Sequence, residues 1–269
     1  MKGFHIGLFT GTLFANKYTS SLYDGYGFDP DGNKNIFQNS FMNRRINIEN
    51  GGYYGGPDRI AQALGVNHSD WSFSETDMST NLKYNVAFMV GFNSRYCFNN
   101  KDAIIFNVNG SKLTLNGNFT ITINNPYGGQ PAIRTCSIIG GEQRLLMQIG
   151  YQRIMGDNDK FNFFMEGGFT LSLAKYLSNQ INITGTNAAN SLTLDLSGYY
   201  SQPLYNSFRA KGLTGVGPGL FAGMGINMSI SPKWTIQLLY QPSYELINIG
   251  DNPKHKLQNA LGLRAYYNF

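Results

Sequence analysis

The three residue types of a hydrolytic triad stand side by side at His68, Ser69 and Asp70. In such a triad the base must reach the nucleophile while the acid orients the base, and neighbours along a chain seldom face one another in that way. We therefore interpret this segment as a polar turn. His5 has no evident acidic partner, and His255 lies between two lysines where it is expected to be solvated.

Oxygen-bearing side chains alternate at Asp29, Asp31 and Asn33 around a glycine. This spacing is part of the pattern of a calcium-binding loop, but the later bidentate Glu of such loops is lacking. The Pro-Asp and Asp-Gly pairs here are also ordinary turn formers. We keep these three residues as a calcium candidate, and we predict no other metal site and no cofactor.

The elements that must position any site are strands, because apolar residues alternate with polar or small ones about eight times along the chain. The clearest case has Phe88, Val90 and Phe92 on one face. The same alternation places Met165 and Leu238 on the outer face of their strands. The expected strands lie at about 3–14, 80–96, 104–123, 133–151, 161–173, 214–230 and 234–245, and a last strand ends at Phe269.

The connections between these strands alternate between short and long, with long loops at about 15–79 and 177–213. The strand that continues to about Ile123 predicts a sheet that projects beyond the others. Within the second long loop, 180–184 and 192–196 are expected to pair as a hairpin above the membrane. A short helix is expected from Pro57 to Gly65, since Pro favours a helix start and Gly a helix end.

This pattern predicts an all-β fold, a transmembrane antiparallel up-and-down β-barrel formed by one domain of residues 1–269. An even number of strands closes the sheet and leaves no backbone edge in hydrocarbon. We expect eight strands, or ten if the 180–196 hairpin enters the membrane. A transmembrane helix is excluded because no stretch approaches the ~20 consecutive apolar residues that spanning requires.

Alternation also assigns side chains to the barrel interior. An eight-stranded barrel is only wide enough for its own side chains, so inward charges should pair and fill it. We expect Arg144 to pair with Glu166 and Arg264 to lie near them, forming a plug. The charged residues assigned to this plug are Lys83, Glu142, Arg144, Glu166, Glu245 and Arg264.

Glycines at positions 215, 217, 219, 223 and 225 resemble a phosphate-binding loop in composition. Such a loop needs a strand before it and a helix after it, and no such context is present. All five glycines share the inward side of one expected strand. We expect them to make room for large inward residues such as Phe164 and Tyr266, and to let the wall curve.

The composition agrees with a barrel, since charged residues make up 14% of the chain against about 25% in soluble proteins. The net charge is +5, but the basic residues are scattered, so we predict no nucleic-acid binding. Cys97 and Cys136 are expected near opposite ends of the wall as two free thiols. The apolar run after Lys2 is broken by polar residues and glycine, so we expect a first strand and not a secretory signal.

Three segments carry a family resemblance: the opening at 7–11 (Gly-Leu-Phe-Thr-Gly), the turn at 231–234 (Ser-Pro-Lys-Trp) and the final strand at 261–269. The chain resembles the small outer-membrane β-barrels common in Bacteroidota, which are related in architecture to OmpX- and OmpA-type eight-stranded barrels. The resemblance implies folding by the barrel-assembly machinery, with Tyr267 and Phe269 as the assembly signal. It carries over no catalytic residues.

The resemblance also implies a location in the bacterial outer membrane with both termini periplasmic, in contact with lipid and lipopolysaccharide. Several such barrels are accessory subunits of machines for secretion, assembly or nutrient uptake. We therefore expect a non-enzymatic structural or interaction subunit that contacts other outer-membrane proteins. The alternatives are a narrow channel for ions or small solutes and, less favoured, a lipid- or peptide-modifying enzyme.

Overall fold

The computed structural model describes residues 2–29, 33–48, 56–124, 130–156, 158, 160–186, 190–197, 214–249 and 253–269. Asp31 of the calcium candidate and residues 198–213 of the second long loop lie outside these ranges. None of the described helices is long and apolar enough to cross a membrane.

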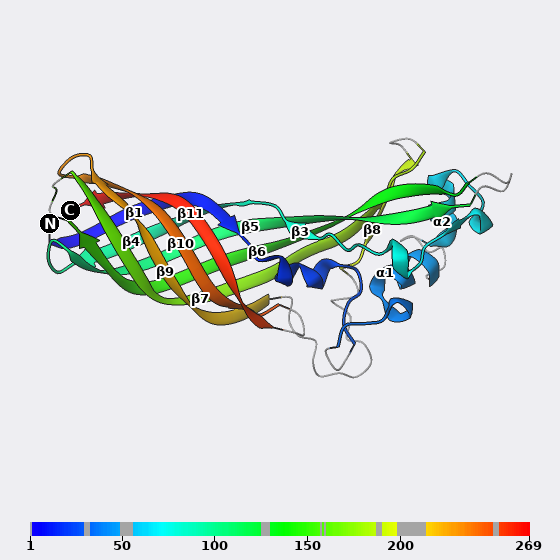
Figure 1. Cartoon of the computed structure of the whole chain (residues 1–269), viewed down its shortest axis with the longest axis horizontal. Coiled ribbons are helices and arrows are strands. Elements are labelled where there is room, and N and C mark those ends of the chain that lie inside the picture. The colour runs from blue at the N-terminus through cyan, green and yellow to red at the C-terminus, as the bar shows by residue number, and fades with distance from the viewer. Residues whose placement is uncertain are drawn as a thin grey trace.

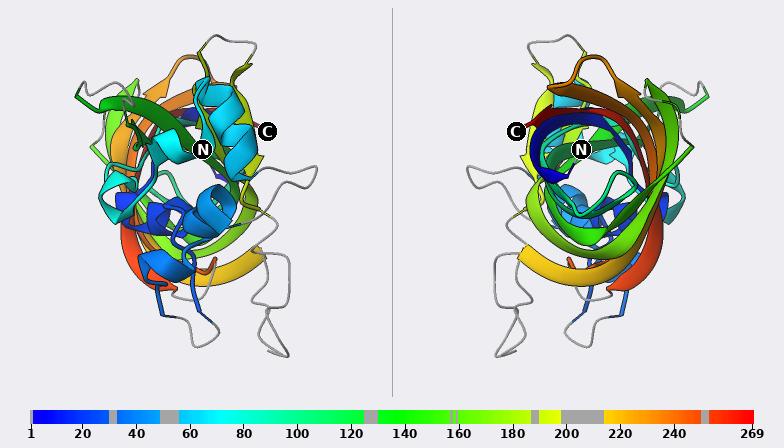
Figure 2. Two further views of the ribbon diagram at one scale, coloured as in Figure 1. Left: turned by 90° about the vertical axis from the view of Figure 1, so that its right-hand side faces the viewer. Right: turned by 90° about the vertical axis from the view of Figure 1, so that its left-hand side faces the viewer.

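Eight long antiparallel strands pair in a closed ring (Figures 1 and 2). Each pairs with the next along the chain, and β1 also pairs with β11, which closes the barrel. The predicted fold class is therefore confirmed, with eight strands and not ten. The ring strands are β1 (Gly3–Phe14), β4 (Ala87–Cys97), β5 (Asp102–Ile123), β6 (Ala132–Met155), β7 (Phe161–Ile183), β9 (Thr214–Ser229), β10 (Trp234–Ile247) and β11 (Lys254–Asn268).

The outer wall of the barrel is apolar, as the alternation predicts. Phe88, Met165 and Leu238 have exposed fractions of 65%, 52% and 40%. Successive side chains of a strand point to opposite faces, so their neighbours along the strand face the interior. Both chain ends lie at the end of the barrel with the short turns (Figure 1).

At the opposite end, β5, β6 and β7 run far beyond the other strands (Figure 1). This confirms the projecting sheet expected from the length of 104–123. The predicted hairpin is also present, because Gln180 to Ile183 pair with β8. The remaining strands are the short β2 (Trp71–Ser72), β3 (Lys83–Tyr84) and β8 (Leu192–Asp195), which pair with β5 or β7.

The first long connection contains the helices, which pack near the projecting sheet (Figure 1). The predicted helix at 57–65 is confirmed as α2, which begins at Pro57 and is capped by Gly65 in the left-handed region at φ 71°. The helical elements are η1 (Lys17–Tyr23), η2 (Phe37–Asn39), α1 (Phe41–Asn43), η3 (Arg44–Ile48), α2 (Pro57–Leu64), η4 (His68–Asp70) and η5 (Glu75–Asp77).

Candidate functional site

A buried ion pair occupies the middle of the barrel interior. Arg264 on β11 donates two hydrogen bonds to Glu166 on β7, with Nη1–Oε2 at 2.7 Å and Nη2–Oε1 at 2.9 Å. Both side chains are fully excluded from solvent. Paired charge-assisted hydrogen bonds of this kind fix the orientation of both groups, so the pair braces opposite sides of the lumen.

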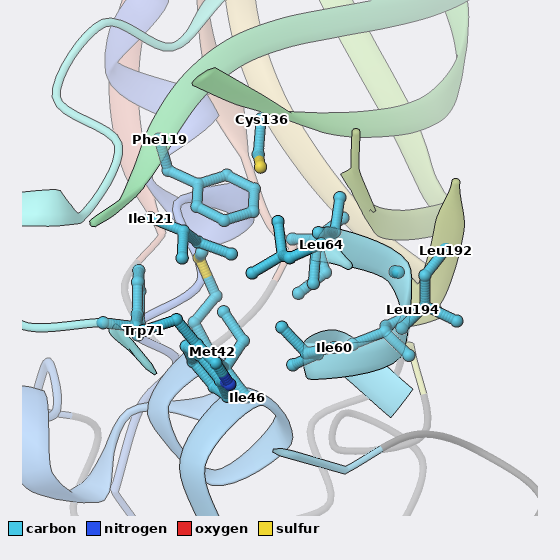
Figure 3. Packing of buried hydrophobic residues seen from close by; sticks show 14 of the residues in the cluster. Met42, Ile46, Ile60, Leu64, Trp71, Phe119, Ile121, Cys136, Leu192 and Leu194 are labelled. Atoms are coloured by element: carbon cyan, nitrogen blue, oxygen red, sulfur yellow. The ribbon is translucent and has the colours of Figure 1, made fainter. Parts of the chain in front are cut away.

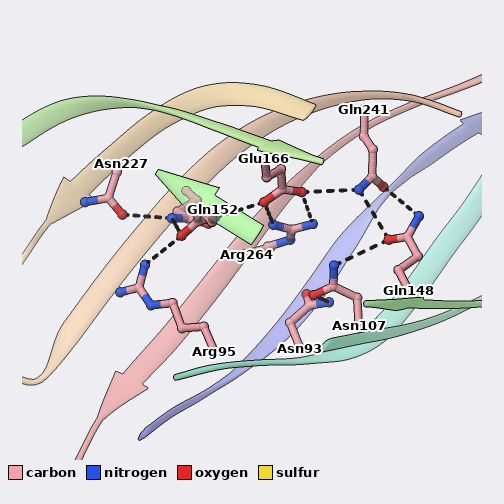
Figure 4. A network of polar contacts seen from close by, with 10 residues as sticks. Asn93, Arg95, Asn107, Gln148, Gln152, Glu166, Asn227, Gln241 and Arg264 are labelled. Carbon is pink, nitrogen blue, oxygen red and sulfur yellow. Dashed lines mark hydrogen bonds and ion pairs between the residues drawn. The ribbon is translucent and has the colours of Figure 1, made fainter. Parts of the chain in front are cut away.

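Amide side chains extend this pair into a network across the lumen (Figure 4). Gln152 and Gln241 donate to the two oxygens of Glu166 at 2.9 and 3.2 Å. Gln241 also contacts Gln148, and Gln152 reaches Gln237. Because these residues come from β6, β7, β10 and β11, the network joins much of the wall through its interior.

A second ion pair lies in the lumen nearer the end from which β5, β6 and β7 project. Arg144 Nε donates to Glu142 Oε1 at 2.6 Å. The other oxygen of Glu142 accepts hydrogen bonds from the hydroxyls of Tyr23 at 3.0 Å and Tyr84 at 2.9 Å. The Glu142 carboxylate is therefore paired on both oxygens, as a buried charge requires.

The helix η1 closes the lumen above this second pair. Tyr23 stacks on Tyr176 of β7 with ring centroids 5.3 Å apart. Arg144 Nη2 donates to Thr19 at 3.0 Å, and Asn179 donates to the Tyr23 carbonyl. The first connection is thus fastened into the barrel mouth by aromatic and polar contacts.

Two expectations about the plug are wrong. Lys83 is exposed, because one extra residue lies between Tyr84 and Met89 compared with the facing stretch of β5. This irregularity reverses the faces, so Lys83 turns outward and Tyr84 inward. Arg144 pairs with Glu142, and Arg264 is the residue that pairs with Glu166.

The barrel interior also contains a cation that the sequence reasoning missed, near the end of β4 that pairs with Ile105 and His5. Arg95 is 5% exposed and lies over the Tyr266 ring at 4.4 Å. It also donates to Gln152 at 3.4 Å. The signal was available, because Arg95 shares the inward side of β4 with Asn93. The interior therefore keeps three acids and three bases: Glu142, Glu166, Glu245, Arg95, Arg144 and Arg264.

Several buried polar atoms of the interior have no hydrogen-bond partner among the described residues, and three of them lie beside glycines of β9. Glu245 is buried, and its Oε2 has no hydrogen-bond partner among the described residues. The hydroxyl oxygens of Thr170 and Ser172 on β7 also have no hydrogen-bond partner among these residues. Gly219 of β9 lies between them, since it pairs with both Glu245 and Thr170. The wall here combines unpaired polar atoms with glycines that carry no side chain.

The β9 glycines follow the predicted steric role in part. An added Cβ at Gly225 would meet Phe164 Cε1 at 2.8 Å, so this glycine does make room for Phe164. Tyr266 instead approaches Gly7 on the adjacent strand β1, at 2.7 Å from an added Cβ. The expectation that the β9 glycines accommodate Tyr266 is therefore wrong.

Beyond the barrel, α1, η3, α2 and β2 pack on the projecting ends of β5, β6 and β7 together with β8 (Figure 3). We call this unit the headpiece. Ile60 and Leu64 of α2 face Ile121 of β5, and these side chains are at most 2% exposed. Thr186 also donates its backbone N–H to Ala63 at 3.1 Å. The headpiece therefore has its own buried hydrophobic core.

The candidate catalytic residues are not arranged as a triad. His68 Nδ1 lies 2.9 Å from Asp58 on α2, and Ser69 donates to Asp70. His5 is buried against Asn268, and His255 stacks on Tyr244. The segment at 68–70 forms η4, which agrees with the predicted polar turn.

Of the calcium candidates, Asp29 accepts a hydrogen bond from the Asn33 backbone N–H at 2.8 Å. The Asn33 side chain donates to the other Asp29 oxygen, which is the geometry of a turn.

Cys97 and Cys136 are free and buried, as predicted. Trp234, Tyr267 and Phe269 form an aromatic cluster near the chain end. The Tyr267 ring centroid lies 5.3 Å from that of Trp234 and 5.1 Å from that of Phe269.

No protein-family model matches the sequence, and no curated protein is detectably similar to it. Among solved structures, the chain is similar to Ail of Yersinia pestis bound to the heparin analogue sucrose octasulfate (10% identity, TM-score 0.41, all of both chains covered). It is also similar to Neisserial surface protein A (10% identity, TM-score 0.41, 100% and 98% covered) and to OprG of Pseudomonas aeruginosa (8% identity, TM-score 0.35, 100% and 97% covered). These neighbours are small outer-membrane β-barrels, and the fold assignment itself rests on the closed strand pairing of this chain.

Proposed function

We propose that this chain is an integral outer-membrane β-barrel that holds a folded headpiece outside the cell as a non-enzymatic interaction subunit. The observation that carries this proposal is the change in side chains along single strands. The outer face of β5 has Ile104 and Phe106 in the barrel but Asn116 and Asn118 in the headpiece. An apolar band that gives way to polar residues along one strand is typical of a membrane boundary.

Both edges of the apolar band have residues that suit an interface. Lys112, Gln143 and Lys175 are exposed cross-strand neighbours at the headpiece edge, where long basic side chains can reach lipid headgroups. Trp234, Tyr267 and Phe269 cluster at the other edge, and aromatic girdles flank transmembrane barrels. Lipid and lipopolysaccharide are the proposed neighbours of the wall, and the barrel-assembly machinery is the proposed route of insertion.

Selective labelling of single cysteines tests the membrane location and the orientation. Asn118→Cys lies on the exposed face of the headpiece, and Lys233→Cys lies in the short turn near the chain ends. In intact cells we expect a membrane-impermeant maleimide to label the first variant only, and permeabilised cells to show both. Labelling of Lys233→Cys in intact cells would contradict periplasmic termini. The unaltered protein, with its two buried cysteines, is the background control.

The interaction role is tested by unfolding the headpiece alone. Ile60→Asp places a charge in the headpiece core, whereas Gln62→Asp places it on the exposed side of the same helix. We expect native gels of outer membranes to show a larger complex with the unaltered protein and with Gln62→Asp, but not with Ile60→Asp. Identical complexes with all three proteins, or none with any, would exclude the headpiece as the binding unit.

The narrow channel is the second candidate, and one observation favours it. Glu245, Thr170 and Ser172 present unpaired polar atoms beside β9 glycines, which leaves part of the lumen less completely filled by side-chain contacts. The cross-lumen Arg264–Glu166 pair, the Glu142–Arg144 pair on β6 and the helix η1 oppose a continuous path. Conductance of the full chain in planar bilayers separates the channel from the interaction subunit.

A further inference from the structure

A pocket with a volume of ≈ 210 Å³ opens at the barrel mouth. Its walls come from η1, the segment that follows η1, and the facing ends of β10 and β11. The apolar part of the lining is formed by Leu22, Phe28, Ile247 and Ile249. The charged part is formed by Glu142, Lys34 and Lys254.

The balance of charge in this pocket is positive. The Glu142 carboxylate is paired with Arg144 at 2.6 Å and with two tyrosine hydroxyls. Lys34 is paired with Asp24 at 2.6 Å. The ammonium of Lys254 has no carboxylate partner among the described residues and lies 5.1 Å from the centroid of the Tyr18 ring. A second ammonium, from Lys256, lies 4.0 Å from the same ring centroid.

The size of the pocket limits the apolar part of a ligand. A cavity of about 150 Å³ lined by Leu, Ile and Phe holds one benzene molecule. A pocket of ≈ 210 Å³ therefore has room for one ring and a small polar group. An apolar wall with a lysine ammonium that lacks a carboxylate partner among the described residues suits a ligand that is apolar at one end and anionic at the other.

We propose that this pocket binds a small organic acid with an apolar body about the size of one aromatic ring. The body lies against Phe28 and Ile247, and the carboxylate lies at the Lys254 ammonium. The pocket is built from this chain alone, so binding does not depend on the partner protein proposed above.

Benzoate is the probe, because its ring and carboxylate match the two parts of the pocket. Binding is measured by saturation-transfer NMR with the full chain in lipid nanodiscs. Detergent is avoided because detergent monomers are themselves amphiphiles and would compete for the pocket. We expect saturable binding that weakens about tenfold in Lys254→Gln, corresponding to about 1.4 kcal/mol. Benzylamine, which has the same ring and the opposite charge, should bind more weakly than benzoate.

Two further variants separate ligand binding from folding. Ser21→Trp adds a ring at an exposed lining position and should abolish benzoate binding without a change in the buried core. Lys233→Gln removes an exposed lysine in a short turn far from the pocket and should bind benzoate like the unaltered protein. The proposal is overturned if benzoate binding is not saturable, if Lys254→Gln binds with unaltered affinity, or if benzylamine binds equally well.

Discussion

At the scale of single residues, the pairing of buried charges organises the barrel interior. The side chains of Arg264 and Glu166 are completely excluded from solvent and are joined by two hydrogen bonds. Removing one partner of such a pair leaves the other charge buried and uncompensated, which is far more costly than the net value of the pair. The stability of the barrel should therefore depend strongly on these two residues together.

We expect Arg264→Met to lower the free energy of unfolding by about 3–5 kcal/mol. The double variant Arg264→Met, Glu166→Gln should recover a large part of that loss, because no buried charge is left. Urea titration in lipid vesicles measures both effects. Lys83→Met is the matched control, since Lys83 is exposed and its loss should change stability by less than about 0.5 kcal/mol. Equal losses for Arg264→Met and Lys83→Met would contradict this view.

The ionisation of Asp24 should make the local stability of residues 20–28, at the barrel mouth, depend on pH. Burial raises the pKa of Asp24 above its ordinary value, although Lys34 and the Tyr26 backbone N–H act in the opposite direction. A raised folded-state pKa gives a stabilising contribution below the ordinary Asp pKa, and this contribution is lost as the pH rises through the raised pKa. Asp24→Asn mimics the neutral form and should lack this dependence.

The corresponding measurement is hydrogen-exchange protection of residues 20–28, corrected for intrinsic rates, at acidic and neutral pH. We expect the unaltered protein and Asp24→Asn to agree at acidic pH, and the unaltered protein to lose protection relative to the variant as the pH rises. A relative gain of protection in the unaltered protein would mean that the Lys34 ion pair outweighs the cost of burying Asp24.

At the scale of elements, the alternation of side chains predicted the barrel strands, the projecting sheet and the 180–196 hairpin. It failed at Lys83, where the irregularity after Tyr84 changes the face. A second irregularity, between Gly141 and Glu142 in the pairing of β6 with β7, moves the buried side of β7 from Tyr176 to Asn179 and Ile181. A bulge is set by pairing with another strand, so a period-two pattern within one strand cannot locate it.

The headpiece core was also beyond the sequence pattern. Met42, Ile46 and Trp71 are buried there, but they lie in short helices and a two-residue strand with no sustained period. Their burial follows from the sheet that β5, β6 and β7 extend toward them. Among the candidate site residues, the five with regular strand positions were placed inward correctly by alternation: Glu142, Arg144, Glu166, Glu245 and Arg264.

Because β9 lies very close to β10 at Gly225, adding one methyl group there should lower the stability of the barrel strongly. An added Cβ at Gly225 would lie 1.9 Å from the Leu238 carbonyl oxygen, which is backbone and cannot rotate away. We expect Gly225→Ala to lower the free energy of unfolding by about 1–3 kcal/mol. At Gly110 on β5 the nearest atom would be 3.9 Å away, so Gly110→Ala should be within about 0.5 kcal/mol of the unaltered protein. Similar urea midpoints for both variants would refute the steric assignment.

At the scale of the whole molecule, the barrel interior is crossed by the Arg264–Glu166 ion pair, filled nearer the mouth by the Glu142–Arg144 pair and covered there by η1. We therefore expect no steady conductance when the full chain is inserted in planar bilayers. Arg144→Ala removes a contact to both Glu142 and Thr19 and is expected to produce only brief openings, if η1 stays in place. A steady current in the unaltered protein that is abolished by changing Arg144 would support the channel and contradict the plug.

The three strands β5, β6 and β7 pass from the barrel into the headpiece without a break. A domain joined by a linker can swing, but here the tilt of the headpiece is inherited from the tilt of the wall. A load applied to the headpiece would travel along the unbroken strands and the β5–β6 ladder into the barrel wall, instead of being absorbed by a hinge. In the proposed orientation, such a construction suits a fixed strut that would set the height and angle of a contact above the cell surface.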